Sequence, residues 1–186
     1  MTDAPGERWR NRTFEDEDFV EADLDELATE ACTFLNCDFS DAVLTGSRHD
    51  NSTFAACTFR GARLIDAAFV GCKLVGSTFV EATVRGITFT GGDLSSVSLG
   101  GASLRDKDLS GVRLVEANLV DADLTGSSLA GADLRGVRIG NTVLRDVDLR
   151  GALLDGFDPR QADLRGARID VEHAIGFAAV FGVRFD

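Results

Sequence analysis

Residues 122–136 have the sequence ADLTGSSLAGADLRG, in which a leucine recurs at every fifth position. Of the 32 positions from 14 to 169 in this register, 29 hold Leu, Phe, Ile or Val, and only Thr29, His49 and Pro159 depart from it. A helix would rotate each fifth residue by about 140°, and a strand would turn it to the opposite face. Neither element explains the period, so the chain must turn a corner once in every five residues.

A second position in each repeat is small. Two residues before the large side chain, 26 of 32 positions hold Ala, Ser, Cys, Val, Thr or Gly. The exceptions are Arg12, Glu17, Leu27, Ile87, Lys107 and Phe157. Fourteen of the twenty glycines lie two residues after the large side chain, where a turn needs a permissive backbone. One large and one small inward residue per repeat would fill a narrow interior without voids.

Columns of residues spaced by twenty show how many sides each coil has. One column contains Phe14, Phe34 and Phe54 followed only by leucines, whereas a spacing of 15 mixes Phe, Thr and Leu without order. We therefore predict an all-β solenoid, a quadrilateral β-helix of about eight coils, which is roughly 35–40 Å long at the ~4.8 Å between paired strands. The predicted segments are a lead-in at 1–11, the β-helix at 12–170, and a C-terminal helical cap and dimerisation segment at 171–186.

The C-terminal segment changes to the 3.6-residue period of a helix. Asp170 is placed to cap this helix and Gly182 to end it. A helix here would cover the open end of the last coil, which otherwise exposes unpaired strand edges. The segment carries more apolar surface than one cap requires, so we expect part of it to contact a second copy. The candidate dimer-interface residues are Phe177, Val180, Phe181 and Phe185.

The net charge of −12 is concentrated at one end of the chain. Residues 1–50 contain 14 acidic and 4 basic residues. Such a charge disfavours direct nucleic-acid binding and favours a basic protein partner. No apolar run approaches the ~18 residues of a membrane span, and the N-terminus lacks the apolar core of a secretory signal. We therefore expect a cytoplasmic protein that has no membrane partner.

Acidic residues recur at the predicted corners. Two adjacent corner columns carry them, and these eight side chains are the candidate partner-binding residues. The first column contains Glu21, Asp41, Glu81 and Asp121, and the second contains Glu26, Asp66, Asp106 and Asp146. The alternative is that each corner aspartate accepts hydrogen bonds from nearby turn amides. An arginine column at 85, 105, 145 and 165 lies beside the second acidic column and would neutralise part of its charge.

The other reactive residue types do not suggest a chemical site. All four cysteines (32, 37, 57 and 72) lie at the small inward position, where a free cysteine packs as a small apolar residue, and their spacing forms no tetrahedral metal cluster. His49 lies at a central interior position, and we expect it to be a hydrogen-bonded core residue. No nucleophile and base occur at a motif spacing. The sequence therefore predicts no cofactor, no metal and no enzymatic activity.

The repeat units Ala122-Asp123-Leu124-Thr125-Gly126 and Ala132-Asp133-Leu134-Arg135-Gly136 resemble the consensus of the pentapeptide-repeat family, and the resemblance extends over residues 12–171. It implies a right-handed quadrilateral β-helix. The segment around Cys37-Asp38-Phe39-Ser40 and the tail from Asp170 to Gly182 are similar to the mycobacterial-type fluoroquinolone-resistance proteins, the MfpA- and Qnr-like DNA mimics. Gram-negative members interrupt the coil with loops, whereas this register never slips between 14 and 169.

The resemblance implies a function. The fluoroquinolone-resistance proteins that this sequence resembles are non-enzymatic mimics of duplex DNA. They bind DNA gyrase, modulate or inhibit it and protect it from fluoroquinolones, and they dimerise through the C-terminal segment. The acidic corner columns are consistent with that implication. The alternative is a structural or scaffolding pentapeptide-repeat module that binds another protein partner.

Overall fold

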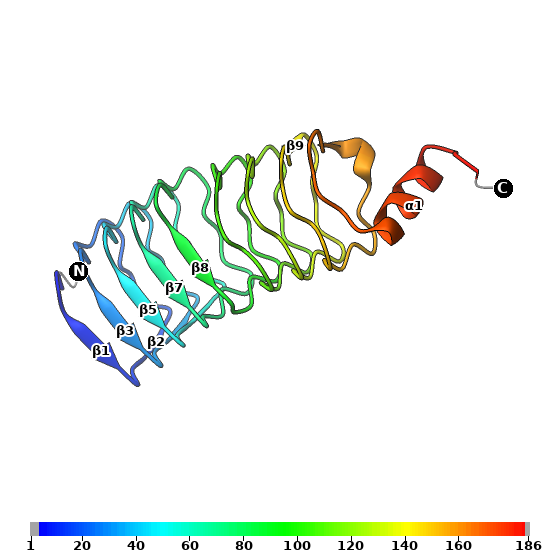
Figure 1. Ribbon diagram of the computed structural model, residues 1–186. Coiled ribbons are helices and arrows are strands. Elements are labelled where there is room, and N and C mark those ends of the chain that lie inside the picture. Colours follow the sequence, from blue (N-terminus) through cyan, green and yellow to red (C-terminus); the bar gives the residue numbers. More distant parts are fainter. Residues whose placement is uncertain (1–3, 185–186) are drawn as a thin grey trace.

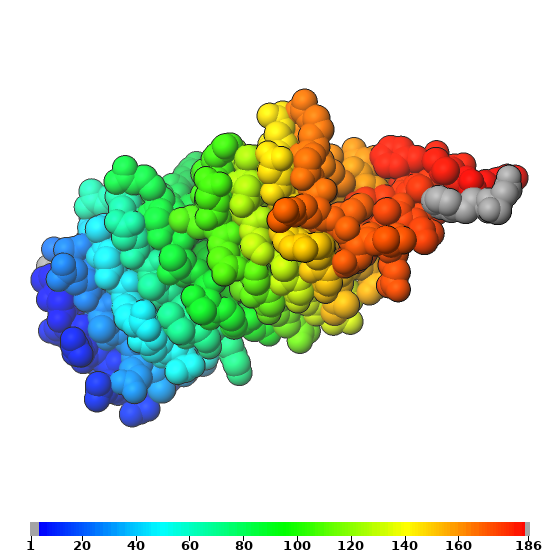
Figure 2. All heavy atoms as spheres, viewed as in Figure 1, coloured from blue at the N-terminus to red at the C-terminus, as the bar shows by residue number. Residues whose placement is uncertain are grey.

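The computed structural model describes residues 4–184 and forms a β-solenoid of about eight turns that ends in a single C-terminal helix (Figure 1). The coils stack along one axis from the N-terminus to the C-terminus, and the helix lies beyond the last coil (Figure 1). The space-filling view shows an elongated, rod-like molecule (Figure 2). The predicted fold class is confirmed.

Three parallel sheets follow the long axis of the rod. The five-stranded sheet contains β1 (Arg8–Arg10), β3 (Ala28–Glu30), β5 (Arg48–Asp50), β7 (Ala68–Val70) and β8 (Thr88–Thr90). The three-stranded sheet contains β2 (Thr13–Glu15), β4 (Thr33–Leu35) and β6 (Thr53–Ala55). The two-stranded sheet pairs β10 (Ala162–Asp163) with β9 (Thr142–Val143). The helical elements are the 3-10 turn η1 (Pro159–Gln161) and the α-helix α1 (Val171–Val180).

Residues in the strands and bridges pair with the residue twenty positions later, which confirms four sides per coil. Phe14 pairs with Phe34 in the β2–β4 ladder, and isolated bridges such as Asp18 with Asp38 continue the same register on the remaining sides. The ladder also includes part of the segment 1–11, because β1 pairs with β3 and the Ala4 N–H donates to the Asp23 carbonyl. The turn η1 lies where Pro159 replaces the large residue of the register.

The interior is filled by the large and small inward residues. Phe34 and Phe54 are buried, and their rings stack with centroids 4.6 Å apart and planes 7° from parallel. His49 occupies the same kind of position, stacks on Phe69, and hydrogen-bonds through its two ring nitrogens to Thr29 and Ser47. Burial lowers the pKa of His49 to about 3. His49 is therefore a neutral core residue, as predicted.

The corners have a left-handed backbone. At every fifth position from 6 to 156 the residue has a positive φ, including seventeen residues that are not glycine. Asn and Asp tolerate this conformation better than most residues, whereas a glutamate such as Glu21 (φ 57°) is less favourable there. The side chain at this position points out of the coil, so acidic residues placed here face solvent.

No helix in the described part of the chain is long and apolar enough to cross a membrane.

Candidate partner-binding surface

The eight predicted acidic residues lie on two adjacent corners of the rod. The first acidic row is Glu21, Asp41, Glu81 and Asp121, and the second acidic row is Glu26, Asp66, Asp106 and Asp146; all eight are exposed and have a positive φ. The two rows border one side of the rod, which holds residues such as 43–45 and 123–125. Among the left-handed residues of the other two corner columns, the acidic ones are Asp16 and Glu116. Acidic corners are therefore gathered on one side of the rod.

Most of these carboxylates have no protein partner. Among the described residues, Glu81 pairs with Arg60 at 3.2 Å and Asp121 accepts a hydrogen bond from Asn141 at 3.1 Å. The other six carboxylates of the two rows make no ion pair or hydrogen bond within the described part of the chain. Six charges therefore remain free to contact a partner.

Glycines in the next coil make room for these aspartates. A β-carbon added to Gly86 would collide with the carboxylate of Asp66, and one added to Gly61 would collide with that of Asp41. The same relation joins Asp106 to Gly126 and Asp146 to Gly166. Each carboxylate thus lies along the corner, over the glycine of the following coil. This contact explains why Asp and Gly alternate in the second acidic row.

A different set of aspartates holds the turns. These residues immediately precede the large inward residue, and each accepts a hydrogen bond from the amide two residues later: Asp18, Asp23, Asp38, Asp93, Asp108, Asp123, Asp133, Asp148, Asp158 and Asp163. Hydrogen bonds from Thr125 hold the pKa of Asp123 at about 2, and those from Arg150 hold the pKa of Asp148 at about 2. The turn-capping alternative therefore belongs to this position rather than to the corner rows.

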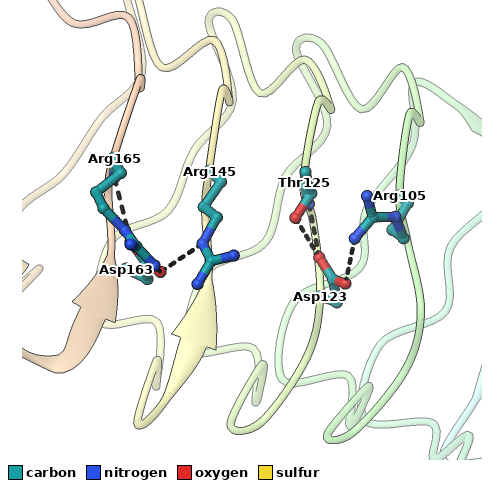
Figure 3. A network of polar contacts seen from close by, with 6 residues as sticks. All are labelled: Arg105, Asp123, Thr125, Arg145, Asp163 and Arg165. Carbon is teal, nitrogen blue, oxygen red and sulfur yellow. Dashed lines mark hydrogen bonds and ion pairs between the residues drawn. The ribbon is translucent and has the colours of Figure 1, made fainter.

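The arginine column does not neutralise the second acidic row by ion pairing. Arg105 binds Asp123 at 2.8 Å, whereas Arg145 and Arg165 both bind Asp163 at 2.6 Å (Figure 3). The sequence interpretation placed these arginines beside the corner acids, but their side chains extend along the flat side of the coil and reach the turn-holding aspartates there (Figure 3). The Asp-x-Arg spacing could have predicted the pair of Asp163 with Arg165, because residues two apart in a strand lie on the same face. Arg105 and Arg145 instead reach the aspartate eighteen residues later, in the next coil, and no local spacing predicts that contact.

The C-terminal helix covers the end of the solenoid only in part. Phe177 stacks on Phe157 with ring centroids 5.7 Å apart. Asp170 has the N-cap position, but its carboxylate accepts from the Gly151 amide at 2.5 Å and makes no side-chain hydrogen bond to its own helix. The ladder register would pair this amide with the Asp170 carbonyl, which instead accepts from Ala174 in the helix, and the Asp170 carboxylate takes its place.

The predicted interface residues fall into two groups. Phe177 is half-buried within the cap, whereas Phe181 is 63% exposed and Val180 39% exposed. Phe185 lies outside the described residues. Val171, Ile175 and Val183 add further exposed apolar surface. A cavity of about 480 Å³ lies between α1 and the last coil and is lined by residues that include Leu154, His173 and Phe177. Exposed apolar surface therefore remains at this end of the rod.

The cysteines are free and buried. Burial raises the pKa of Cys57 to about 12 and that of Cys72 to about 11. In the described part of the chain, no three His, Cys, Asp or Glu side chains gather in a way that could hold a metal ion.

Two family models match the sequence. The pentapeptide-repeat model matches residues 108–141 and 142–170 with eight copies of the repeat. The model of the SV2A/B/C luminal domain matches residues 7–97. No curated protein matches the sequence.

The solved structures of QnrB1, described as a plasmid-mediated fluoroquinolone resistance protein, have a similar fold. One trypsin-treated variant aligns with a TM-score of 0.86 and 25% identity over 98% of this chain and 91% of that chain. A second trypsin-treated variant aligns with a TM-score of 0.68 and 21% identity over 97% and 100% of the two chains. Full-length QnrB1 aligns with a TM-score of 0.67 and 22% identity over 95% and 100%. The five-residue register, the four-sided coil and these matches agree: residues 108–170 match the pentapeptide-repeat family, and the β-solenoid is similar to that of QnrB1.

Proposed function

We propose that this protein is a non-enzymatic mimic of duplex DNA that binds DNA gyrase, modulates or inhibits it, and protects it from fluoroquinolones. The observation that carries the proposal is the pair of acidic rows on adjacent corners of a rod, with six carboxylates free of protein partners. The similarity to QnrB1 supports the link to fluoroquinolone resistance. The proposal also places the protein in the cytoplasm, with its partner.

The acidic rows present charge in a regular array. Within the second acidic row, Asp66, Asp106 and Asp146 recur every other coil, about 10 Å apart at the spacing of paired strands. This is coarser than the ~7 Å between phosphates along one strand but of the same order. A basic surface that binds a DNA segment would attract such an array, and the attraction would weaken as salt rises.

A homodimer joined through α1 would lengthen this surface. One rod of roughly 35–40 Å corresponds to about eleven base pairs at the ~3.4 Å rise per base pair, and two rods joined tail to tail would reach roughly 80–100 Å. The exposed Phe181 and Val180 would form an isologous contact at the two-fold axis. The acidic N-terminal ends would then lie at the far ends of the dimer.

The test is a supercoiling assay with purified gyrase. We expect the protein at micromolar concentration to reduce supercoiling at low salt, with less reduction at high salt, and to preserve activity when a fluoroquinolone is added. Absence of any effect on supercoiling and on drug sensitivity at low salt would contradict the proposal and would favour a scaffolding role with another protein partner.

A further inference from the structure

The backbone ladder is interrupted between the coil of residues 81–91 and the coil of residues 101–111. In a regular coil, the amide at a corner donates to the carbonyl nineteen residues later, as Asp66 does to Arg85 and Asp106 does to Thr125. Within the described chain, seven amides at this junction lack the ladder bond that their equivalents one coil earlier or later make. They belong to Glu81, Val84, Gly86, Phe89, Gly91, Ser103 and Asp108.

The interruption affects only part of the coil. The bridge between Thr78 and Ser98 precedes it and the bridge between Asp93 and Arg113 follows it. Two of the four sides therefore stay paired, while two adjacent sides and the corner between Gly86 and Asp106 are open. The two coils are therefore joined on two adjacent sides and separated on the other two.

Two openings lie where the ladder is missing. One has a volume of about 590 Å³ and lies between residues 82–86 and 101–105, and a second of about 150 Å³ lies between residues 88–91 and 108–110. Lys107 lines both. The inward-facing Ala82 and Ala102 are half-buried here, although Ala62 and Ala122 of the same column are 0% exposed. The openings therefore reach toward the interior.

Lys107 occupies an inward position that is otherwise small or apolar. In the same column, Leu27 and Ile87 are buried at 1% and 0% exposure, and Ser127 at 1%. The interior therefore accommodates a large apolar side chain in this column. Moving an unpaired ammonium group into the apolar interior is costly, so a lysine extends its apolar stem along the coil and keeps its charged end in water. Lys107 is half-buried and makes no ion pair within the described chain.

We propose that the charge of Lys107 holds this junction open and makes it a hinge about which the two blocks of the rod, residues 4–80 and 112–170, bend relative to each other. The opening lies on the corner that carries the second acidic row, between Asp66 and Asp106. Bending there changes the spacing and direction of the acidic rows, which would let a rigid solenoid follow a curved partner surface. The hinge itself does not depend on the identity of that partner.

Hydrogen exchange of single amides tests the opening. The seven unpaired amides should exchange rapidly in the natural protein, whereas the paired amides of Asp66 and Asp106 should exchange slowly. Lys107→Met keeps the length of the side chain and removes its charge, so it should close the ladder and slow exchange at the seven sites by about tenfold or more. The matched control is Lys73→Met, since Lys73 is the other lysine in the sequence and lies exposed on an intact ladder. Lys73→Met should leave the exchange rates of the seven amides unchanged.

Distances between spin labels test the bending. Cysteines replacing Arg63 and Arg145 would place one label in each block on the side that opens, and the native thiols should stay unlabelled because all four are buried. We expect a broad distance distribution that Lys107→Met narrows and Lys73→Met does not. Slow exchange at the seven amides in the natural protein, or fast exchange and an equally broad distribution in Lys107→Met, would overturn the proposal.

Discussion

Neutralising the second acidic row should weaken gyrase binding without unfolding the rod. The variant carries Glu26→Gln, Asp66→Asn, Asp106→Asn and Asp146→Asn. Asn tolerates the left-handed backbone of these corners as well as Asp does. Each of the four carboxylates is exposed and makes no ion pair or hydrogen bond within the described residues. The substitutions therefore remove charge and little else.

The expected magnitude follows from the exposure of the carboxylates. An exposed ion pair contributes about 0.2–1 kcal/mol, so loss of four pairs with a basic partner should cost about 2 kcal/mol, or roughly a thirtyfold rise in Kd. The salt dependence of binding should become shallower, because fewer charge contacts remain to be screened.

The matched control removes the same charge from elsewhere on the rod. Glu15→Gln, Asp16→Asn, Glu116→Gln and Asp155→Asn neutralise four exposed acids on the side opposite the two rows or on the corner beside it. Titration of gyrase at two salt concentrations, with circular dichroism to check the fold, compares the two variants. If both variants weaken gyrase binding equally, only net charge matters. If neutralising the second acidic row leaves gyrase binding unchanged, the proposed role of that row is refuted.

Three further outcomes follow from the structure. Phe181→Asp should give a folded monomer in sedimentation, because the exposed ring lies outside the cap, and a dimer that survives this change would contradict the proposed interface. Phe177→Asp should instead lower thermal stability, because it removes the ring that stacks on Phe157. The pKa of His49 is lowered to about 3, so the unfolded chain binds the extra proton and the free energy of unfolding should fall by about 1.6 kcal/mol between pH 6.5 and pH 5; urea denaturation of His49→Phe should show a smaller fall, and an equal fall would refute that cause. The thiols of Cys57 and Cys72 should resist alkylation at pH 8 until the protein unfolds, since burial raises both pKa values; rapid modification of the folded protein would contradict this burial.

The sequence alone was sufficient to predict the architecture. A period of five with large and small inward residues allows one kind of packing, and columns such as Phe14, Phe34 and Phe54 determine the register because like residues must stack across paired strands. The acidic rows were predictable for the same reason, since a fixed repeat places Asp66 and Asp106 on the same corner. The terminal helix followed from a change of period at Asp170.

Only the tertiary structure showed which polar groups are already used. The sequence placed arginines beside the second acidic row, but whether Arg105 reaches Asp106 or Asp123 depends on side-chain direction, which a repeat pattern does not contain. In the sequence, Lys107 is only one of six exceptions to the small inward position. The open ladder around it could not be predicted, because one exception is absorbed by the interior, as at Leu27, while another separates two coils. The outcome depends on the balance between burying a charge and keeping backbone hydrogen bonds, and that balance is decided only in the assembled coil.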